Sequence, residues 1–279
     1  MIKLGDWNEL KVNRFTDYGA YLDGGEVGEI LMPNAYVQRG VRLGDTVTVF
    51  VYLDQEERLV ATAENPLARV GDFAWLRVAW VNEFGAFLDW GLMKDLFVPF
   101  REQKMRMEKD RSYLVYIYVD EETRRIVGTA KVERWLRPAL SAEYYRGREV
   151  SLLVQQKTEL GFKVIVDNAH AGLVYSDQIF EEPHAGDRLN GYVVNVRPDG
   201  KLDVSLQRLG KGRFRDFEEV LLDELKNAGG TLPFTDRSSS DAIAERFGVS
   251  KKTFKRAVGG LYKKRIIILS NDCITLVAQ

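Results

Sequence analysis

Short runs of β-branched and aromatic residues recur through the first three quarters of the chain. Two of them, Thr46–Tyr52 and Tyr113–Tyr118, are each followed by a charged turn that begins at Asp54 and at Asp120. Another short apolar run follows each turn. Runs of this kind bounded by turn residues predict β-strands, so each pair predicts a hairpin.

The pattern is repeated along the chain. The stretch Tyr18–Asp23 returns sixty-six residues later as Phe84–Asp89. The same offset relates Gly5 to Gly71, Leu10 to Leu76, Val12 to Val78 and Asp54 to Asp120. A third, more divergent copy is indicated by Gly147–Val150, Leu160–Phe162 and Gly186–Asp187. Repetition at a fixed spacing indicates several small units in place of one large domain.

Each unit has room for five short strands and little helix, which predicts a small closed barrel of the OB type. The predicted barrels occupy residues 1–64, 67–132 and 146–209. A helical connector is expected over Arg134–Arg146. Gly19 and Gly85 fall inside strands, where glycine is expected to mark a bulge or a sharp bend.

After residue 212, the spacing of apolar residues changes from that of strands to that of helices. Phe217, Leu221 and Leu225 recur at helical spacing, and a second helix is expected from the serines at 238–240 to Gly248. A third helix over Lys251–Lys264, with Ser250 as its cap, completes a helix-turn-helix. A hairpin formed by residues 266–269 and 274–277 then predicts a winged helix over 213–279.

Charge is distributed unevenly along this chain. The net charge is −1, yet residues 1–210 carry 27 basic and 32 acidic side chains, whereas residues 211–279 carry 13 and 9. Electrostatic attraction therefore favours nucleic acid at the C-terminal segment. Apolar runs are shorter than the ~18 residues of a membrane span, the first residues lack a signal-peptide pattern, and Cys273 is the single cysteine. A cytoplasmic protein is expected.

The third predicted helix has one basic face. Phe254, Val258 and Leu261 share the opposite face at ~100° per residue. The basic face consists of Lys252, Lys255, Arg256 and Lys263, with Gly259 among them. These side chains are candidate phosphate contacts, and the alternative is a solvated face that only keeps the domain soluble.

The strings Val12–Leu22, Val78–Leu88 and Gly172–Ser176 resemble the S1 RNA-binding domain. In that family two aromatics flank a Gly-Ala pair and form an RNA-binding face with a histidine. The resemblance assigns this role to Tyr18, Tyr21, Phe84 and Phe87, and it adds Phe162 and Tyr175 in the third copy. The histidine position reads Leu31, Val98 and Tyr175, while Leu160 and Lys163 replace the aromatics of the third copy. Periodicity alone favours strand aromatics that fill a barrel interior.

The whole arrangement, three barrels and a winged helix, resembles the conserved virulence factor B family of bacterial RNA-binding regulators. This resemblance implies post-transcriptional regulation through single-stranded, U-rich RNA, with several weak sites acting together. Ribosomal or RNA-decay proteins are candidate partners. Nothing in the sequence demands a dimer, so a monomer is expected.

Catalytic chemistry has little support in the sequence. His170 and His184 are the only histidines and are expected on surface loops, and no phosphate loop or metal-ligand spacing occurs. We therefore expect no enzyme activity, cofactor or metal. Two alternative functions remain open: a protein adaptor that docks on the ribosome or a nuclease, and a DNA-binding transcription regulator led by Lys252, Lys255 and Arg256.

Overall fold

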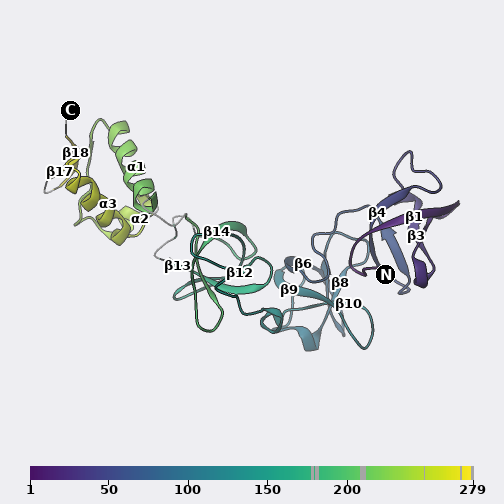
Figure 1. The fold of residues 1–279 in the computed structure, drawn as a ribbon. Helices are drawn as coiled ribbons and strands as arrows, with labels where there is room; N and C mark the ends of the chain where they lie inside the picture. Colours follow the sequence, from purple (N-terminus) through teal and green to yellow (C-terminus); the bar gives the residue numbers. More distant parts are fainter. Residues whose placement is uncertain (177–178, 180–181, 208–211, 248, 271, 278–279) are drawn as a thin grey trace. The chain divides into compact units, whose positions relative to one another are not determined.

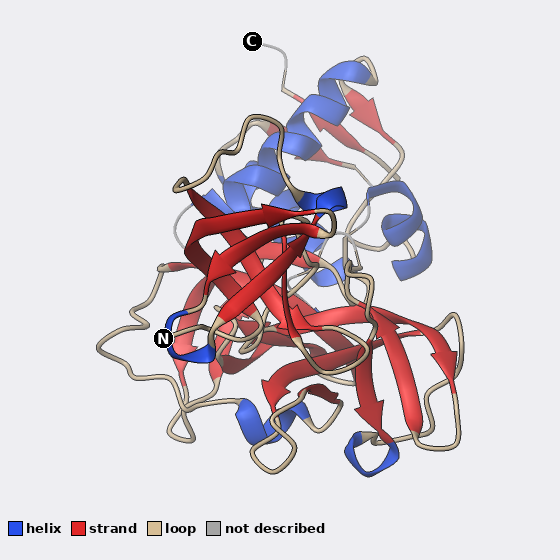
Figure 2. Cartoon of the chain, turned by 90° about the vertical axis from the view of Figure 1, so that its right-hand side faces the viewer, coloured by secondary structure: helices blue, strands red, loops and turns tan. Residues whose placement is uncertain are grey.

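The computed structural model describes residues 1–176, 179, 182–207, 212–247, 249–270 and 272–277 of the chain. It divides into two compact units, Met1–Leu136 and Arg137–Gln279. Strands are the main regular elements of the first unit, whereas the second unit combines a barrel with the longer helices, which lie in the C-terminal domain (Figures 1 and 2).

Three closed five-stranded barrels confirm the predicted architecture. The first contains β1 (Asp6–Thr16), β2 (Gly19–Asp23), β3 (Glu29–Pro33), β4 (Thr46–Leu53) and β5 (Leu59–Thr62). The second contains β6 (Phe73–Val81), β7 (Gly85–Asp89), β8 (Leu96–Pro99), β9 (Ser112–Val119) and β10 (Ile126–Thr129). The third contains β11 (Glu149–Thr158), β12 (Gly161–Val166), β13 (His170–Tyr175), β14 (Arg188–Val196) and β15 (Leu202–Ser205). In each barrel the third and fifth strands pair in parallel and close the sheet.

The bulge of each barrel lies on its first strand and not at the glycine of the second. Pairing between the first two strands shifts register at Asn13, Ala79 and Gln155, which are equivalent positions. Gly85 meets a different requirement: a Cβ there would lie 2.3 Å from the carbonyl oxygen of Val98 on the neighbouring strand. Glycine is needed for this close approach of two backbones.

A hydrophobic cluster joins the two barrels of the first unit, and the first barrel also has a core of its own. Phe50 and Tyr52 of the first barrel are buried in the same cluster as the interior of the second barrel. The Trp90 ring, on the loop between β7 and β8, packs edge-on against Phe50 with 6.0 Å between ring centroids. The backbone of Val70 donates a hydrogen bond to the carbonyl oxygen of Gly5. Burial of these aromatic rings joins the barrels into one compact unit.

The connector before the third barrel is not the expected α-helix. It contains a short 3-10 helix, η4 (Val132–Trp135), followed by turns. Tyr144 is buried in the core of the third barrel and stands edge-on to the ring of His170. His170 lies on β13 and not on a surface loop, and its Nδ1 is 2.7 Å from the carbonyl oxygen of Arg137, which requires a proton on Nδ1. His184 is exposed, as expected.

The C-terminal domain contains the expected helices and hairpin. Helices α1 (Gly212–Asn227), α2 (Ser240–Phe247) and α3 (Lys251–Lys263) pack against a three-stranded sheet of β16 (Thr231–Leu232), β17 (Ile267–Leu269) and β18 (Ile274–Leu276). The Ser250 hydroxyl accepts a hydrogen bond from the backbone of Thr253, which confirms the predicted cap. Gly248, the predicted end of α2, lies outside the described residues.

An ion pair with one buried partner joins α1 to the C-terminal end of α3. Glu218 of α1 is buried and pairs with the ammonium of Lys264. Gly260 leaves the room for this carboxylate, because a Cβ there would lie 1.9 Å from Glu218 Oε1. None of the helices within the described residues is long and apolar enough to cross a membrane.

Candidate nucleic-acid interface

Strand pairing defines which side chains occupy equivalent positions in the three barrels. Gly19, Gly85 and Gly161 pair with Pro33, Pro99 and Tyr175. The residues before these glycines are Tyr18, Phe84 and Leu160, and those two positions after them are Tyr21, Phe87 and Lys163. The cross-strand partners of the second set are Arg14, Trp80 and Gln156. This register allows the three predicted faces to be compared side chain by side chain.

In the first barrel, Tyr18 is open to solvent and Tyr21 is covered. The Tyr18 ring, in the turn between β1 and β2, is 76% exposed. The Arg14 guanidinium lies 3.8 Å from the centroid of the Tyr21 ring and donates two hydrogen bonds to Glu29. The hydrogen bond from Arg14 lowers the pKa of Glu29, so the pair stays ionised at neutral pH. Tyr18 therefore offers a free ring face, whereas Tyr21 supports a cation.

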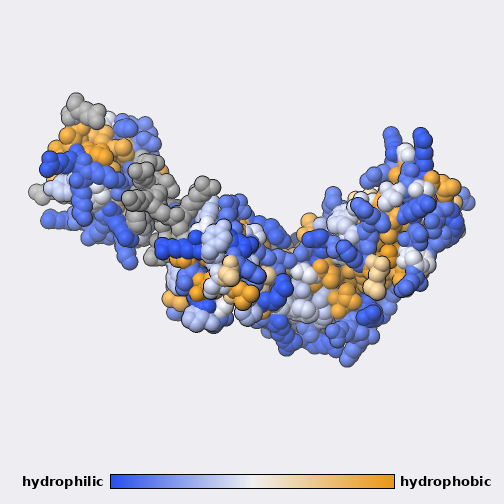
Figure 3. Space-filling view, in the orientation of Figure 1, coloured by the Kyte–Doolittle hydropathy of each residue, from blue (hydrophilic) through white to orange (hydrophobic). Residues whose placement is uncertain are grey.

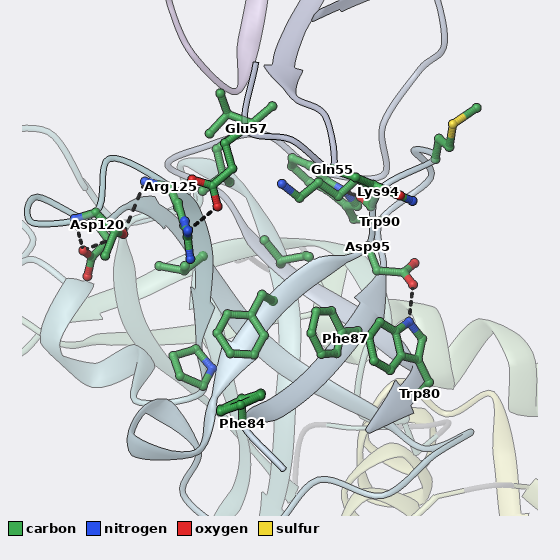
Figure 4. Close-up of a pocket in the computed structure, with 18 of the residues that line it drawn as sticks. Gln55, Glu57, Trp80, Phe84, Phe87, Trp90, Lys94, Asp95, Asp120 and Arg125 are labelled. Atoms are coloured by element: carbon green, nitrogen blue, oxygen red, sulfur yellow. Dashed lines mark hydrogen bonds and ion pairs between the residues drawn. The ribbon is translucent and has the colours of Figure 1, made fainter. Parts of the chain in front are cut away.

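In the second barrel, a tryptophan takes the place of this arginine. The Trp80 ring stacks on Phe87 with 3.7 Å between centroids and 3° between planes, and its Nε1 donates a hydrogen bond to Asp95. Phe97 packs on Phe87 at 4.9 Å. Phe84 is 64% exposed. The second barrel therefore presents Phe84 and the outer face of Trp80, with Phe87 beneath as a support (Figure 4).

In the third barrel, the predicted aromatics do not form an open face. Phe162 is only 4% exposed because it occupies the interior position of Ala20 and Ala86, so its ring cannot receive a base there. The Tyr175 hydroxyl donates a hydrogen bond to Asp203 and accepts one from Arg197. At the two positions equivalent to Tyr18 and Tyr21, the exposed side chains are those of Leu160 and Lys163.

Strand pairing shows that the three residues expected at the position of the family's histidine are not equivalent. Tyr175 is equivalent to Pro33 and Pro99, whereas Leu31 is equivalent to Phe97. Val98 is buried. Gly19, Gly85 and Gly161 each pair with a residue 14 positions later, so the spacing is the same in all three barrels. Leu31, Val98 and Tyr175 lie 12, 13 and 14 positions after these glycines and are therefore three different positions.

A groove of about 870 Å³ lies over the aromatic side chains of the second barrel. Phe84, Phe87 and Trp80 line one side of it, and Gln55 and Glu57 of the first barrel lie on the other (Figure 4). The charged lining residues are Glu57, Lys94, Asp95, Arg101, Asp120 and Arg125. Burial lowers the pKa of Lys94. The lining is thus apolar along its aromatic side and balanced in charge elsewhere. Figure 3 shows apolar side chains gathered over this part of an otherwise mainly hydrophilic surface.

The basic side chains of α3 lie on the side turned away from its core. Phe254, Ala257, Val258 and Leu261 are buried against the domain. Lys252, Lys255, Arg256 and Lys263 are exposed, and a Cβ at Gly259 would meet nothing within 4 Å. This face can approach an anionic backbone closely.

Sequence reasoning missed three residues of the interface, Trp80, Phe97 and Arg14. Comparison of the two clear copies contains the signal for each, since Trp80 replaces Arg14 and Phe97 replaces Leu31 at an offset of sixty-six. Both second-copy residues are aromatic where the first copy has none. No group of three or more His, Cys, Asp or Glu side chains among the described residues is arranged to hold a metal ion.

Comparisons with known proteins match every domain. Models of the S1 domain match residues 4–64 and 70–130, a model of the second domain of virulence regulatory factor CvfB matches 140–208, and a CvfB-like winged helix model matches 219–276. The uncharacterized protein YitL of Bacillus subtilis is 30% identical over 94% of this chain and 90% of its own. Conserved virulence factor B of Staphylococcus epidermidis is 30% identical over 85% and 82%.

A solved structure is similar over almost the whole length. It is a multidomain protein with nucleic acid binding domains from Streptococcus pneumoniae, 25% identical, with 98% of both chains covered and a TM-score of 0.44.

Proposed function

Because the chain belongs to the conserved virulence factor B family, we propose that it is a nucleic-acid-binding regulator that binds single-stranded RNA and acts after transcription. Bases stack on the exposed rings of the first two barrels, and the basic face of α3 contacts phosphates. The binding needs no catalytic group.

The observation that carries this proposal is a pair of exposed rings at equivalent positions, Tyr18 and Phe84. A single exposed ring is ordinary on a protein surface, but exposed rings at the same position of two barrels, one of them beside an apolar groove, favour a binding role. Base stacking on an aromatic ring contributes about 1–3 kcal/mol and needs no positive charge. Near-neutral barrels can therefore bind RNA.

Titration of the full chain into labelled oligonucleotides at two salt concentrations tests the proposal. Fluorescence anisotropy should show tighter binding to single-stranded U-rich RNA than to duplex DNA, with affinity that falls as salt rises. Preference for duplex DNA would favour a transcription regulator led by α3. Absence of binding to every oligonucleotide would favour a protein adaptor.

Replacement of the exposed rings tests the stacking contribution. Tyr18→Ala and Phe84→Ala should each weaken RNA binding by about 1–3 kcal/mol. The slope of log affinity against log salt should stay the same, because stacking releases no counterions. Tyr145→Ala removes an exposed ring from the connector before the third barrel and serves as the matched control. Equal affinities for all three variants would exclude the two rings from the site.

A further inference from the structure

The turn between β4 and β5 of the first barrel is held at the groove of the second barrel. The Lys94 ammonium, on the loop between β7 and β8, donates a 2.6 Å hydrogen bond to the carbonyl oxygen of Asp54 in this turn. Trp90, on the same loop, packs against Phe50 at the base of the hairpin. These contacts keep Gln55 and Glu57 facing the aromatic side of the groove (Figure 4).

The loop that makes these contacts differs from its counterpart in the first barrel. At an offset of sixty-six residues, Trp90 corresponds to Gly24 and Lys94 to Gly28. The neighbouring position changes from Glu26 to a buried leucine, Leu92. Trp90 packs on the other barrel, Lys94 donates a hydrogen bond to it, and Leu92 is buried in the cluster that joins the two barrels. The second copy is thus built to receive the turn of the first.

An ion pair crosses from one barrel to the other at the edge of the groove. The Glu57 carboxylate pairs with the Arg125 guanidinium, and both side chains line the groove. Glu57 is 43% exposed and Arg125 is 52% exposed. Exposed pairs of this kind are weak because water screens them, so a competing anion can displace the carboxylate.

We propose that the first barrel completes the RNA site on the second, with Glu57 as a removable partner that occupies Arg125 until a phosphate replaces it. Bases lie on Phe84 and Trp80, and the adjoining phosphate pairs with Arg125 after Glu57 has moved away. This inference rests on the proposed function. It adds that Glu57, a residue of the first barrel, limits the RNA affinity of the site on the second barrel.

Glu57→Gln tests the role of this carboxylate with little change in shape. Arg125 then faces the groove without a carboxylate partner in the turn. Because the phosphate no longer competes with a carboxylate for Arg125, the variant should bind about two- to fivefold more tightly, and the negative charge removed from the groove should also change the salt slope. Fluorescence anisotropy of the full chain with single-stranded U-rich RNA, at several salt concentrations, measures both quantities.

Two further variants test whether the gain in RNA affinity comes from the pair of Glu57 and Arg125. Glu56→Gln removes the same charge from the same turn, but Glu56 pairs with Arg58 and does not line the groove. It should change affinity much less than Glu57→Gln. Arg125→Gln should weaken binding, and in its presence Glu57→Gln should no longer strengthen it, because the two residues act through one contact.

The outcomes separate this inference from the proposed function. If Phe84→Ala weakens RNA binding while Glu57→Gln and Glu56→Gln behave alike, the site exists but the first barrel does not limit it, and the inference is wrong. A gain from Glu57→Gln that persists in the Arg125→Gln background would also overturn it. If the wild-type chain binds no single-stranded RNA, both proposals fall together.

Discussion

A single glycine position determines how closely two strands approach in each barrel. A Cβ at Gly19, Gly85 or Gly161 would lie 2.1, 2.3 or 2.0 Å from a carbonyl oxygen of the adjacent strand. Real Cβ atoms do not tolerate such distances, so a side chain there would separate the strands. Tyr18 and Phe84 directly precede two of these glycines, which connects barrel stability to the proposed RNA site.

Gly85→Ala should therefore destabilise the first unit by about 1–3 kcal/mol, the range for an overpacked interior. Urea unfolding followed by tryptophan fluorescence measures this decrease, because all five tryptophans belong to Met1–Leu136. Gly259→Ala provides the opposite case, since a Cβ there meets nothing and alanine favours α3 by about 1 kcal/mol. Circular dichroism at helical wavelengths reports on that domain. Unchanged stability of Gly85→Ala would mean that the two strands can separate without cost.

For single aromatic side chains, the sequence predicted solvent exposure well in the turns and poorly within the strands. Tyr18 and Phe84 precede the strand and are exposed. The resemblance of the third copy to the S1 domain assigns Phe162 and Tyr175 to the RNA-binding face. The structure instead buries Phe162 in the barrel interior, and the Tyr175 hydroxyl donates a hydrogen bond to Asp203. Their side-chain direction depends on a register that only the paired strands define.

The hydrophobic pattern of the sequence predicts the three α-helices better than it predicts the connector after β10. Periodicity identified α1, α2 and α3 because each buries one apolar face, and the Ser250 cap followed from its spacing. The connector after β10 carries helix-compatible residues but ends its short helix at Trp135, whose ring stacks on Tyr116 at 4.4 Å. Tertiary packing of Trp135 and Tyr144 overrides local preference there.

The basic face of α3 leads to a prediction about salt. Replacing Lys252 and Lys255 with alanine should lower the slope of log affinity against log salt by about 0.7 for each phosphate that the helix no longer binds. Lys226→Ala, at the end of α1, removes one exposed positive charge from another helix and should leave the slope nearly unchanged. If Lys226→Ala lowers the salt slope as much per charge as the substitutions at Lys252 and Lys255 do, α3 acts only through the net charge of the domain.

We expect several modest RNA sites along the chain and not one strong site. The first barrel presents one free ring, Tyr18, the second presents Phe84 and the outer face of Trp80, and the third presents Leu160 and Lys163 in their place. Sites joined in one chain raise each other's local concentration, so total affinity can exceed that of any one site by about 10²–10⁴. The repeat predicted this division of the chain. It did not predict that the first two barrels form one unit, because the cluster that joins them contains Trp90, which corresponds to Gly24 in the first copy.

Affinity should accordingly rise steeply with RNA length. A U-rich RNA of about 6 nucleotides fills about one barrel, whereas one of about 40 nucleotides reaches several sites of about 4–16 nucleotides each. We expect at least about tenfold tighter binding of the longer RNA, measured by anisotropy at equal salt. If the affinity rises only in proportion to the number of positions along the longer RNA at which one site can bind, the protein has a single site.

The loop at Trp90 also has a consequence for how the protein is made. The ribosome releases β1 to β5 before Trp90, so the first barrel emerges while Phe50 contacts Trp7 but still lacks the Trp90 ring. An apolar patch is then open to the cell for the seconds that synthesis of the next strands takes, at about 5–20 residues per second. Substitutions at Trp90 would prolong that interval, and their first effect would be a lower yield of intact protein during translation.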